Sequence, residues 1–137
     1  MAAKRRNIQP DALHQRRVAG LVLYSHVVSL EGPQRLLFIS GQVARSKNGD
    51  IVGVGDMRAQ LRQVLENLKA AVEAGGGTLA NLVRTNTYVT DIEEYFKHVD
   101  VRMEYYSHAM PTSTTVEVRR LAQPELLVEI DAIAAIE

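Results

Sequence analysis

The feature that most constrains the fold of this chain is an amphipathic segment near its middle. Asp56 precedes the segment, where an aspartate can cap a helix, and the glycines at 75–77 follow it, where glycine accepts the left-handed conformation that ends one. The segment predicts a helix of about five turns that packs one apolar face against another layer. Its apolar residues recur at spacings of three and four, at Leu61, Val64, Leu65, Leu68, Ala71 and Val72.

Shorter segments rich in valine, leucine and threonine lie on both sides of this helix. The turn at Glu31-Gly32-Pro33-Gln34 predicts that the first two of them form a β-hairpin. A second helix is predicted to begin at a capping box, Thr90-Asp91-Ile92-Glu93. Strands are predicted over residues 18–30, 35–40, 52–54, 81–90, 114–121 and 126–135.

The order of these elements predicts an α+β fold. Two helices cannot easily cover both faces of a sheet this wide, so we expect both of them on one face. The strands that must form the other face are not polar, and we therefore predict a homo-oligomer in which sheet faces meet. The apolar residues that support this expectation are Val116, Val118, Val128, Ile130, Ala132 and Ala134.

The charge of the chain, 16 basic against 16 acidic residues, is unevenly distributed. Residues 1–17 are strongly basic, and we interpret them as a solvated N-terminal arm. Residues 18–137 are acidic overall and show no repeat or linker, so we interpret them as a single domain. Because an acidic domain offers no surface for a polyanion, we expect no nucleic-acid partner.

The composition excludes several kinds of chemistry. The chain has no cysteine, which excludes disulfides, thiol catalysis and thiolate metal sites. Its four histidines are not at a ligand spacing, and no glycine-rich phosphate loop opens a helix. We therefore expect no metal site. The apolar runs are too short to span a bilayer, and we expect a cytoplasmic protein without a membrane partner.

Two carboxylates stand out on the last predicted strand. Strand alternation places Glu129 and Asp131 on the same face, between apolar residues. Such a carboxylate can act as a general base for water or can lie on a solvated outer face, and the residues alone leave both interpretations open. The run Thr112-Ser113-Thr114-Thr115 can likewise line a polar pocket or simply favour a strand.

Several segments follow one another in an order typical of one family. They are Ser40-Gly41-Gln42, Gln60 with Leu65-Glu66-Asn67-Leu68, Val83 with Thr87-Tyr88-Val89-Thr90-Asp91, Val116-Glu117-Val118 with Leu121, and Val128-Glu129-Ile130-Asp131-Ala132-Ile133-Ala134. From about Tyr24 to Ile136, the chain resembles the RidA/YjgF/YER057c/L-PSP family. The resemblance implies a chorismate-mutase-like fold, with a mixed β-sheet and two helices packed on one face, and a homotrimer with clefts between its subunits.

The resemblance also implies an activity. Members of the family hydrolyse reactive enamines and imines, such as 2-iminopropanoate, to 2-keto acids and ammonia without a cofactor. Glu129 matches the glutamate that activates water, which favours the catalytic interpretation of this residue. Tyr24 matches a tyrosine of the substrate pocket, and Ser40 with Gly41 matches its Ser-Gly wall.

One position departs from the family pattern. The family's Pro-Ala-Arg-Ser is Pro111-Thr112-Ser113-Thr114 here, so Ser113 replaces the arginine that grips the substrate carboxylate. A serine hydroxyl is neutral and cannot form a charge-assisted pair with a carboxylate. The resemblance therefore does not carry the usual substrate over to this chain.

Three interpretations of the function follow. In the first, the trimer binds a small metabolite other than a simple 2-imino acid and hydrolyses it with Glu129, while Ser113, Thr114 and Thr115 supply hydroxyl contacts. In the second, the protein is a 2-iminobutanoate/2-iminopropanoate deaminase, as is typical of the family. In the third, it is a non-catalytic ligand-binding or regulatory trimer. RNA cleavage, suggested by the family's older name, is disfavoured by the acidic domain.

Overall fold

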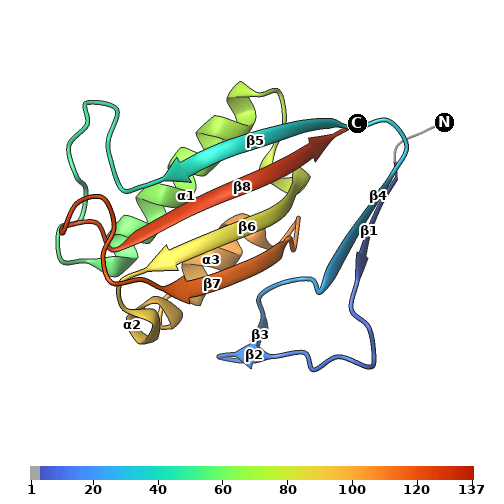
Figure 1. Ribbon diagram of the computed structural model, residues 1–137, viewed down its shortest axis with the longest axis horizontal. Helices are drawn as coiled ribbons and strands as arrows, with labels where there is room; N and C mark the ends of the chain where they lie inside the picture. Colours follow the sequence, from blue (N-terminus) through green and yellow to red (C-terminus); the bar gives the residue numbers. More distant parts are fainter. Residues whose placement is uncertain (1–3) are drawn as a thin grey trace.

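Within residues 4–137, the part of the chain described by the computed structural model, four strands form a mixed sheet with three helices on one face (Figure 1). The order of strands in this sheet is β5-β8-β6-β7, while β1 pairs with β4 and β2 pairs with β3. The elements are β1 (Lys4–Ile8), β2 (Arg17–Val18), β3 (Leu21–Val22), β4 (Val27–Glu31), β5 (Arg35–Gln42), α1 (Met57–Ala74), the 3-10 turn η1 (Leu79–Asn81), β6 (Leu82–Val89), α2 (Ile92–Phe96), α3 (Val99–Tyr106), β7 (Thr112–Glu117) and β8 (Val128–Ile136).

Helix α1 has the boundaries that the sequence predicts. The Asp56 carboxylate accepts a hydrogen bond from the Ala59 amide at 3.0 Å, which satisfies one of the free amides of the first turn. At the other end Gly76 has a φ of +91°, a conformation that favours glycine. The predicted apolar stripe is buried against the sheet, at Leu61, Val64, Leu65, Leu68 and Val72.

The sheet joins parallel and antiparallel strands around β8. This strand is antiparallel to both β5 and β6, and β6 is parallel to β7. Parallel neighbours need a long crossover, and α2 with α3 supplies it between β6 and β7. The hydrophobic core lies between the sheet and the helices, and the predicted α+β fold with the helices on one face is confirmed.

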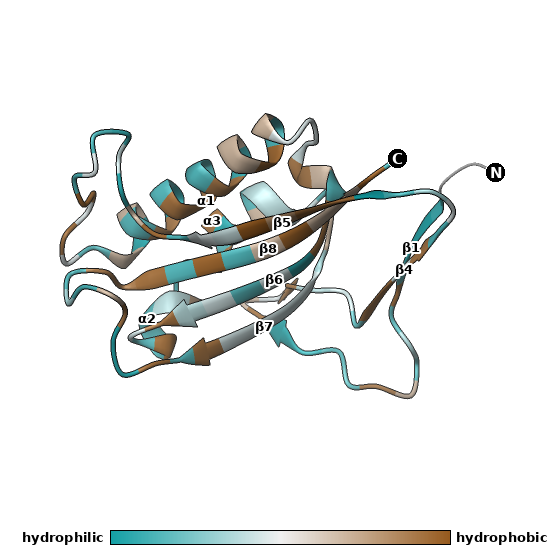
Figure 2. Cartoon of the chain, turned by 45° about the horizontal axis from the view of Figure 1, so that its top comes forward, coloured by the Kyte–Doolittle hydropathy of each residue, from teal (hydrophilic) through white to brown (hydrophobic). Residues whose placement is uncertain are grey.

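The two faces of the sheet differ along β8, where the hydropathy alternates from residue to residue (Figure 2). The apolar row of Val128, Ile130, Ala132 and Ala134 is buried beneath the helices, and Glu129, Asp131 and Ile133 lie half-buried on the open face. This apolar row was predicted to lie on the open face, and that prediction is wrong. The row faces the helices because their apolar stripes need it as a partner.

The apolar surface of the open face comes from other strands. Leu36 and Phe38 on β5 and Val116 on β7 are exposed there, and Phe38 is 76% exposed. Large exposed apolar side chains that share one face mark an interaction surface more often than chance does. The open face therefore retains the character from which a homo-oligomer was predicted.

The hairpin predicted around Glu31-Gly32-Pro33-Gln34 is wrong. This turn connects β4 to β5, but β4 pairs with β1 and β5 pairs with β8. The predicted strand over 18–30 is interrupted by Ala19 and Gly20, both at positive φ. The segment 52–54 makes no strand, and only Arg45 and Ile51 form an isolated bridge nearby. Local patterns report strand propensity and do not identify the partner strand.

The second predicted helix is divided into α2 and α3. Asp91, not Thr90, caps α2, because its carboxylate accepts a hydrogen bond from the Glu94 amide at 3.0 Å. The amides of Lys97 and His98 then bond to carbonyls only three residues back, at 3.2 and 3.0 Å. Such bonds tighten the chain as in a 3-10 turn, and α3 begins again at Val99.

The basic N-terminal segment contributes a strand. Over residues 4–8 the chain pairs with β4 instead of being solvated and frayed. Arg5 donates hydrogen bonds to the carbonyls of Ala80 and Ala109 at 3.0 and 2.6 Å, and Asn7 donates to the Ser25 hydroxyl at 2.9 Å. The division of the chain into residues 1–17 and residues 18–137 stays a prediction.

Candidate functional site

Glu129 lies in a depression on the open face of the sheet. Strand β8 places it opposite Tyr88 of β6, with its side chain half-buried. We call this depression the Glu129 pocket, and its volume is about 390 Å³. The side chains and backbone that line it belong to Gly41, Tyr88, Val118, Arg120, Leu121, Ala122, Glu129 and Asp131.

Gly41 provides the space that the Glu129 carboxylate occupies. The ladder between β5 and β8 is irregular between Ile39 and Gln42, where β5 bulges. A methyl carbon added to Gly41 would lie 2.9 Å from the carboxyl carbon of Glu129 and would overlap its carboxylate. Bulges commonly re-aim the chain beside functional groups. The Ser-Gly motif therefore has a steric reason, since the absent side chain of Gly41 sets the position of Glu129.

The two carboxylates of β8 differ in their hydrogen bonds. Asp131 accepts from the Asn86 amide at 2.8 Å and from the Tyr88 hydroxyl at 3.1 Å. The bond to Asp131 raises the pKa of Tyr88 above its usual value. The Glu129 carboxylate receives no hydrogen bond from any group in residues 4–137. The Asp131 carboxylate is thus occupied by hydrogen bonds to neighbouring strand residues, whereas the Glu129 carboxylate is free to bind water.

Two polar residues of α1 hold the segments around this pocket. Gln60 is fully buried, donates to the carbonyls of Gly53 and Glu125, and accepts from the Leu127 amide at 2.8 Å. Asn67 donates to the carbonyls of Val43 and Arg45, both at 3.0 Å. These hydrogen bonds fix the chain just after Gly41 and just before Glu129. They give Gln60 and Asn67 a structural reason to be part of the sequence motif.

A second pocket lies at the β7 edge of the sheet. We call it the Arg102 pocket, and its volume is about 130 Å³. Ser113 and Thr115 of β7 stand opposite Thr85 and Thr87 of β6, which are buried under the helices, so they face the helix side. The pocket is lined by Arg16, Val18, Leu23, Tyr24, Phe96, Arg102, Ser113 and Thr115.

The predicted site residues therefore fall into separate groups. Glu129 and Gly41 meet in one pocket, and Tyr24, Ser113 and Thr115 line the other, on the opposite face of the sheet. Thr114 faces the open side, where its hydroxyl accepts a hydrogen bond from Arg84 at 2.8 Å. Ser40 lies in a third depression, beside Phe38.

Arg102 is not among the site residues predicted from the sequence. The signal for it was present, because Tyr95, Val99, Arg102 and Tyr106 are spaced by four, three and four residues. An arginine in the apolar stripe of a helix is rarely buried without a reason. All four of these residues are buried in the structure.

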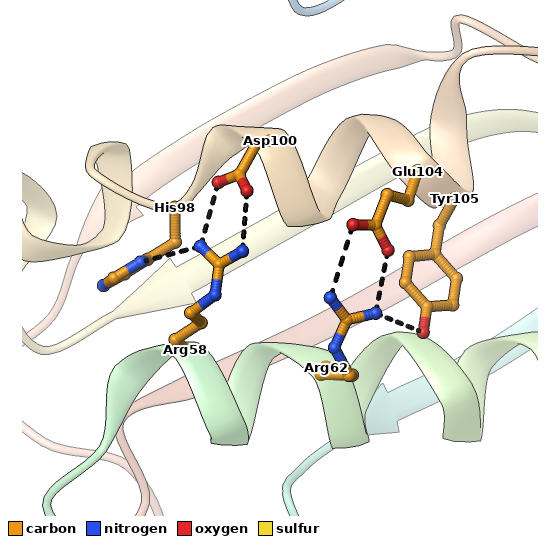
Figure 3. A network of polar contacts seen from close by, with 6 residues as sticks. All are labelled: Arg58, Arg62, His98, Asp100, Glu104 and Tyr105. Carbon is orange, nitrogen blue, oxygen red and sulfur yellow. Dashed lines mark hydrogen bonds and ion pairs between the residues drawn. The ribbon is translucent and has the colours of Figure 1, made fainter.

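Two ion pairs fix α3, which carries Arg102, against α1 (Figure 3). Arg58 donates to both carboxylate oxygens of Asp100, at 3.0 and 2.6 Å, and Arg62 donates to Glu104 at 2.8 Å. The hydrogen bond from Arg58 lowers the pKa of Asp100 to about 2. These bidentate pairs link the exposed sides of α1 and α3.

Neither a metal site nor a membrane-spanning helix is found in the described residues. No group of three or more histidine, aspartate or glutamate side chains in residues 4–137 is arranged to hold a metal ion. Over the same residues, no helix is both long and apolar enough to cross a bilayer.

Comparison with known proteins identifies the family. The family model described as Endoribonuclease L-PSP matches residues 14–136. The chain belongs to the RidA/YjgF/L-PSP family. A RutC family protein of Pyrococcus horikoshii is 42% identical to it over 99 residues, which are 72% of this chain and 77% of that protein.

Solved structures of the RidA/YjgF/L-PSP family share this fold. YyfB of Yersinia pestis, a Rid protein of unknown function, is 35% identical with a TM-score of 0.84, covering 96% of this chain and 98% of its own. E. coli TdcF, solved with bound serine, is 29% identical with a TM-score of 0.67, covering 74% of this chain and 81% of its own. The predicted family and its chorismate-mutase-like fold are confirmed.

Proposed function

We propose that this protein hydrolyses a C=N bond in a small enamine or imine, with Glu129 as the base that activates water. The observation that carries this proposal is the Glu129 carboxylate, which packs against Gly41 without a hydrogen bond from residues 4–137. A carboxylate in this state can accept the proton of an attacking water. Water adds to the imine carbon, and the proton that Glu129 takes from the water passes to the nitrogen. Ammonia then departs, and the carbonyl product remains.

The reaction takes place in a cleft between the subunits of a homotrimer. Support for the assembly comes from membership of the family and from the apolar side chains on the open face, above all Phe38. When a second subunit covers that face, it excludes water around Glu129. Desolvation strengthens a carboxylate as a base, because it disfavours the charged form.

The leading version of the proposal takes a substrate other than a simple 2-imino acid. Ser113 stands where the family carries an arginine, and a serine cannot grip a carboxylate by charge. A second version, 2-iminobutanoate/2-iminopropanoate deamination, is favoured by one observation. Arg102 and Arg16 line the same pocket as Ser113, so cations are present beside the altered position.

The test supplies freshly generated imines, with and without a carboxylate, and follows release of the carbonyl product. We expect Glu129→Gln to lower hydrolysis by about 10²- to 10⁴-fold without loss of folding. Glu66→Gln, which changes an exposed glutamate of α1, is the matched control and keeps the wild-type rate.

Each alternative has its own outcome in this assay. Rapid release of keto acid from simple 2-imino acids rejects the leading version and supports the second. If no imine is hydrolysed, and Glu129→Gln leaves the function in cells intact, the protein is a non-catalytic ligand-binding trimer.

A further inference from the structure

Tyr88 lies in the Glu129 pocket, directly opposite Glu129. Strand β6 carries it in register with Glu129 on β8, and directly opposed residues of antiparallel strands are neighbours. The two side chains lean in different directions, because the Glu129 carboxylate packs against Gly41 on β5 and the Tyr88 hydroxyl reaches Asp131. Both residues line the depression of about 390 Å³. A small substrate in this pocket therefore has the carboxylate on one side and the phenol on the other.

The hydrogen of the Tyr88 hydroxyl is engaged by Asp131. An ionised carboxylate only accepts hydrogen bonds, and the two oxygen atoms are 3.1 Å apart, so the hydroxyl is the donor. The second oxygen of Asp131 accepts from the Asn86 amide at 2.8 Å, which fixes the carboxylate between two donors. A phenol has one hydrogen and accepts through its lone pairs. Toward a molecule in the pocket, Tyr88 therefore acts as an acceptor.

The charges around the phenol keep it in this state. The hydrogen bond to Asp131 raises the pKa of Tyr88, and burial and the negative charges of Asp131 and Glu129 raise it further. The positive charge of Arg84 acts in the opposite direction and is a smaller cause. Arg120, which also lines the pocket, donates hydrogen bonds to backbone carbonyls of its own loop at 3.1 and 3.3 Å. At pH 7 Tyr88 is thus a neutral phenol that keeps its proton.

We propose that Tyr88 binds the N–H group of the imine and so distinguishes the substrate from its carbonyl product. This inference rests on the proposed hydrolysis at Glu129 and adds the residue that recognises the nitrogen. An imine that releases ammonia carries an N–H donor, whereas its carbonyl product has only an acceptor oxygen in the same place. The lone pairs of Tyr88 attract the donor and repel the acceptor, and a site built for a donor rejects an analogue that lacks it.

In the reaction, Tyr88 holds the nitrogen of the protonated imine while Glu129 takes a proton from water. The water oxygen bonds to the imine carbon, and one electron pair of the C=N bond moves to the nitrogen, which then receives the proton from Glu129. The C–N bond breaks, ammonia departs with its electron pair, and the hydroxyl hydrogen of the adduct passes to Glu129 as the carbonyl forms. Tyr88 keeps its own proton throughout. Asp131 is a positioning residue, because it holds that proton away from the substrate.

Steady-state kinetics test the role of Tyr88. The full chain receives the imine that the wild type hydrolyses fastest, and carbonyl release is corrected for spontaneous hydrolysis. We expect Tyr88→Phe to lower kcat/KM by about 10- to 100-fold, because a hydrogen bond to a charged group is lost. Tyr105→Phe, which removes a hydroxyl of α3 that accepts from Arg62, is the matched control and keeps the wild-type value. The melting temperatures of both variants check their folding.

Asp131→Asn tests whether this residue acts through Tyr88. One of the two oxygens that accept from Asn86 and Tyr88 becomes an amide nitrogen, so the phenol hydrogen is no longer held away from the pocket. We expect kcat/KM to fall by about 5-fold in the wild-type background and not to fall further in the Tyr88→Phe background, because residues that share a network are not additive. Equal losses in both backgrounds would overturn the positioning role of Asp131.

A binding measurement tests the same contact without turnover. Acetamidinium is a stable, planar cation that resembles a protonated imine, and acetone has the same shape with a carbonyl oxygen. In protein labelled with ¹³C at tyrosine Cζ, the chain's five tyrosines are observed by NMR, and the resonance of Tyr88 is identified by its loss in Tyr88→Phe. We expect acetamidinium to shift this resonance and acetone to leave it unchanged.

The proposal is overturned if Tyr88→Phe keeps the wild-type kcat/KM, or if acetamidinium leaves the Tyr88 resonance unchanged. It is also overturned if acetone shifts that resonance as strongly as acetamidinium does. Failure of the proposed function gives a different result, in which no imine is hydrolysed and acetamidinium alone still shifts the Tyr88 resonance. In that case the binding role of Tyr88 stands, and the pocket is not catalytic.

Discussion

Glu129 on the open face of the sheet and Arg102 on the helix-covered face differ in how far the fold buries them. On the open face, Glu129 is half-buried beside Gly41 and has apolar Phe38 exposed on the same face. On the helix-covered face, at the β7 edge, Arg102 is 2% exposed and donates hydrogen bonds to the Tyr95 hydroxyl and the Leu23 carbonyl. One chain thus buries this cation completely and leaves Glu129, the proposed base, half-buried on the face that no helix covers.

The difference arises because helices cover one face of the sheet and not the other (Figure 1). Helices α1 and α3 exclude water from the covered face, so a charge placed there needs polar partners within the fold, which Arg102 has in the Tyr95 hydroxyl and the Leu23 carbonyl. The open face has no such layer in one chain, so in the proposed trimer a second subunit would cover it.

The largest loss of activity on the open face is expected from a substitution at Gly41. Gly41→Ala should lower turnover of the C=N substrate about 100-fold, because a displacement of roughly 1 Å at a reacting group has an effect of that size. The added methyl carbon overlaps the Glu129 carboxylate. Steady-state kinetics measure the effect, with the melting temperature as a check on folding.

The double variant Gly41→Ala/Glu129→Asp is the control for this steric explanation. The shorter carboxylate makes room for the methyl group, so the double variant should be faster than Gly41→Ala alone. An unchanged rate in Gly41→Ala would show that the packing between Gly41 and Glu129 is irrelevant to catalysis.

The assembly of the open face is tested at Phe38. Phe38→Glu should convert the proposed trimer into monomers, because the side chain is 76% exposed in one chain and a charge there opposes burial between subunits. Light scattering after size-exclusion chromatography gives the mass. Val54→Glu, at an apolar side chain that is 66% exposed on a loop, should leave the assembly unchanged. A trimeric Phe38→Glu protein would contradict the proposed interface.

The covered face depends on the buried amide of Gln60. Gln60→Ala should lower the free energy of unfolding by about 2–3 kcal/mol, because buried backbone groups lose their partners. Those groups are the carbonyls of Gly53 and Glu125 and the amide of Leu127. Urea denaturation measures the change. Gln63→Ala, which loses one bond to Asn67, should lower the free energy by less than about 1 kcal/mol.

On the covered face, a substitution at Thr87 is expected to raise stability, whereas the substitution at Gln60 lowers it. Its hydroxyl is fully buried under the helices and has no partner within residues 4–137. Thr87→Val should therefore raise the free energy of unfolding by about 1 kcal/mol, because an unpaired polar group is replaced by a methyl group. Thr114→Val on the open face loses the bond from Arg84 and should give no gain. Thermal denaturation of both variants decides the matter.

The smallest effect is expected at the ion pair between Arg58 and Asp100. Asp100 titrates at about 2 in the folded protein against an ordinary pKa of 3.8. A carboxylate whose pKa is lowered by folding stabilises the fold at every pH above its ordinary pKa. This stabilisation disappears as the pH falls through the pKa of the folded state. Asp100→Asn should therefore melt slightly below the wild type at pH 7, and the gap should close between pH 3.8 and 2.

The control for this pH dependence is Asp11→Asn. Asp11 is exposed and makes no ion pair in the described residues, so its replacement should leave the melting temperature unchanged across the same pH range. If the gap for Asp100→Asn persisted at pH 2, a contact other than the charge would have to explain it.

Much of the fold was predictable because its signals are local. The cap at Asp56, the apolar stripe of α1 and the glycines at 75–77 act within a few turns of one helix, and each has its predicted role. The alternation of side chains along β6 was equally predictable, with Thr85 and Thr87 buried on one face and Asn86 on the open face. The hairpin after Glu31 failed, because the partner of β5 is β8, which lies far along the chain.

The candidate site was predicted only in part. Sequence motifs selected Glu129 and Gly41, which the structure brings together, and also Tyr24 and Ser113, which it places in the other pocket. Thr114 was grouped with Ser113 because they are adjacent, but strand alternation turns the two to opposite faces. Arg102 was missed because no motif contains it.

Sequence patterns alone were enough to identify helix α1, the four strands of the main sheet, the carboxylates that share a face of β8, and the family that the chain resembles. Only the tertiary structure decided that Gly41 makes room for Glu129 and that Arg102 lies beside Ser113 without a counter-charge. The physical reason is the range of the interactions. Capping and periodicity act between neighbours in sequence, whereas burial and pairing of a charge depend on strands and helices that meet only when the chain is folded.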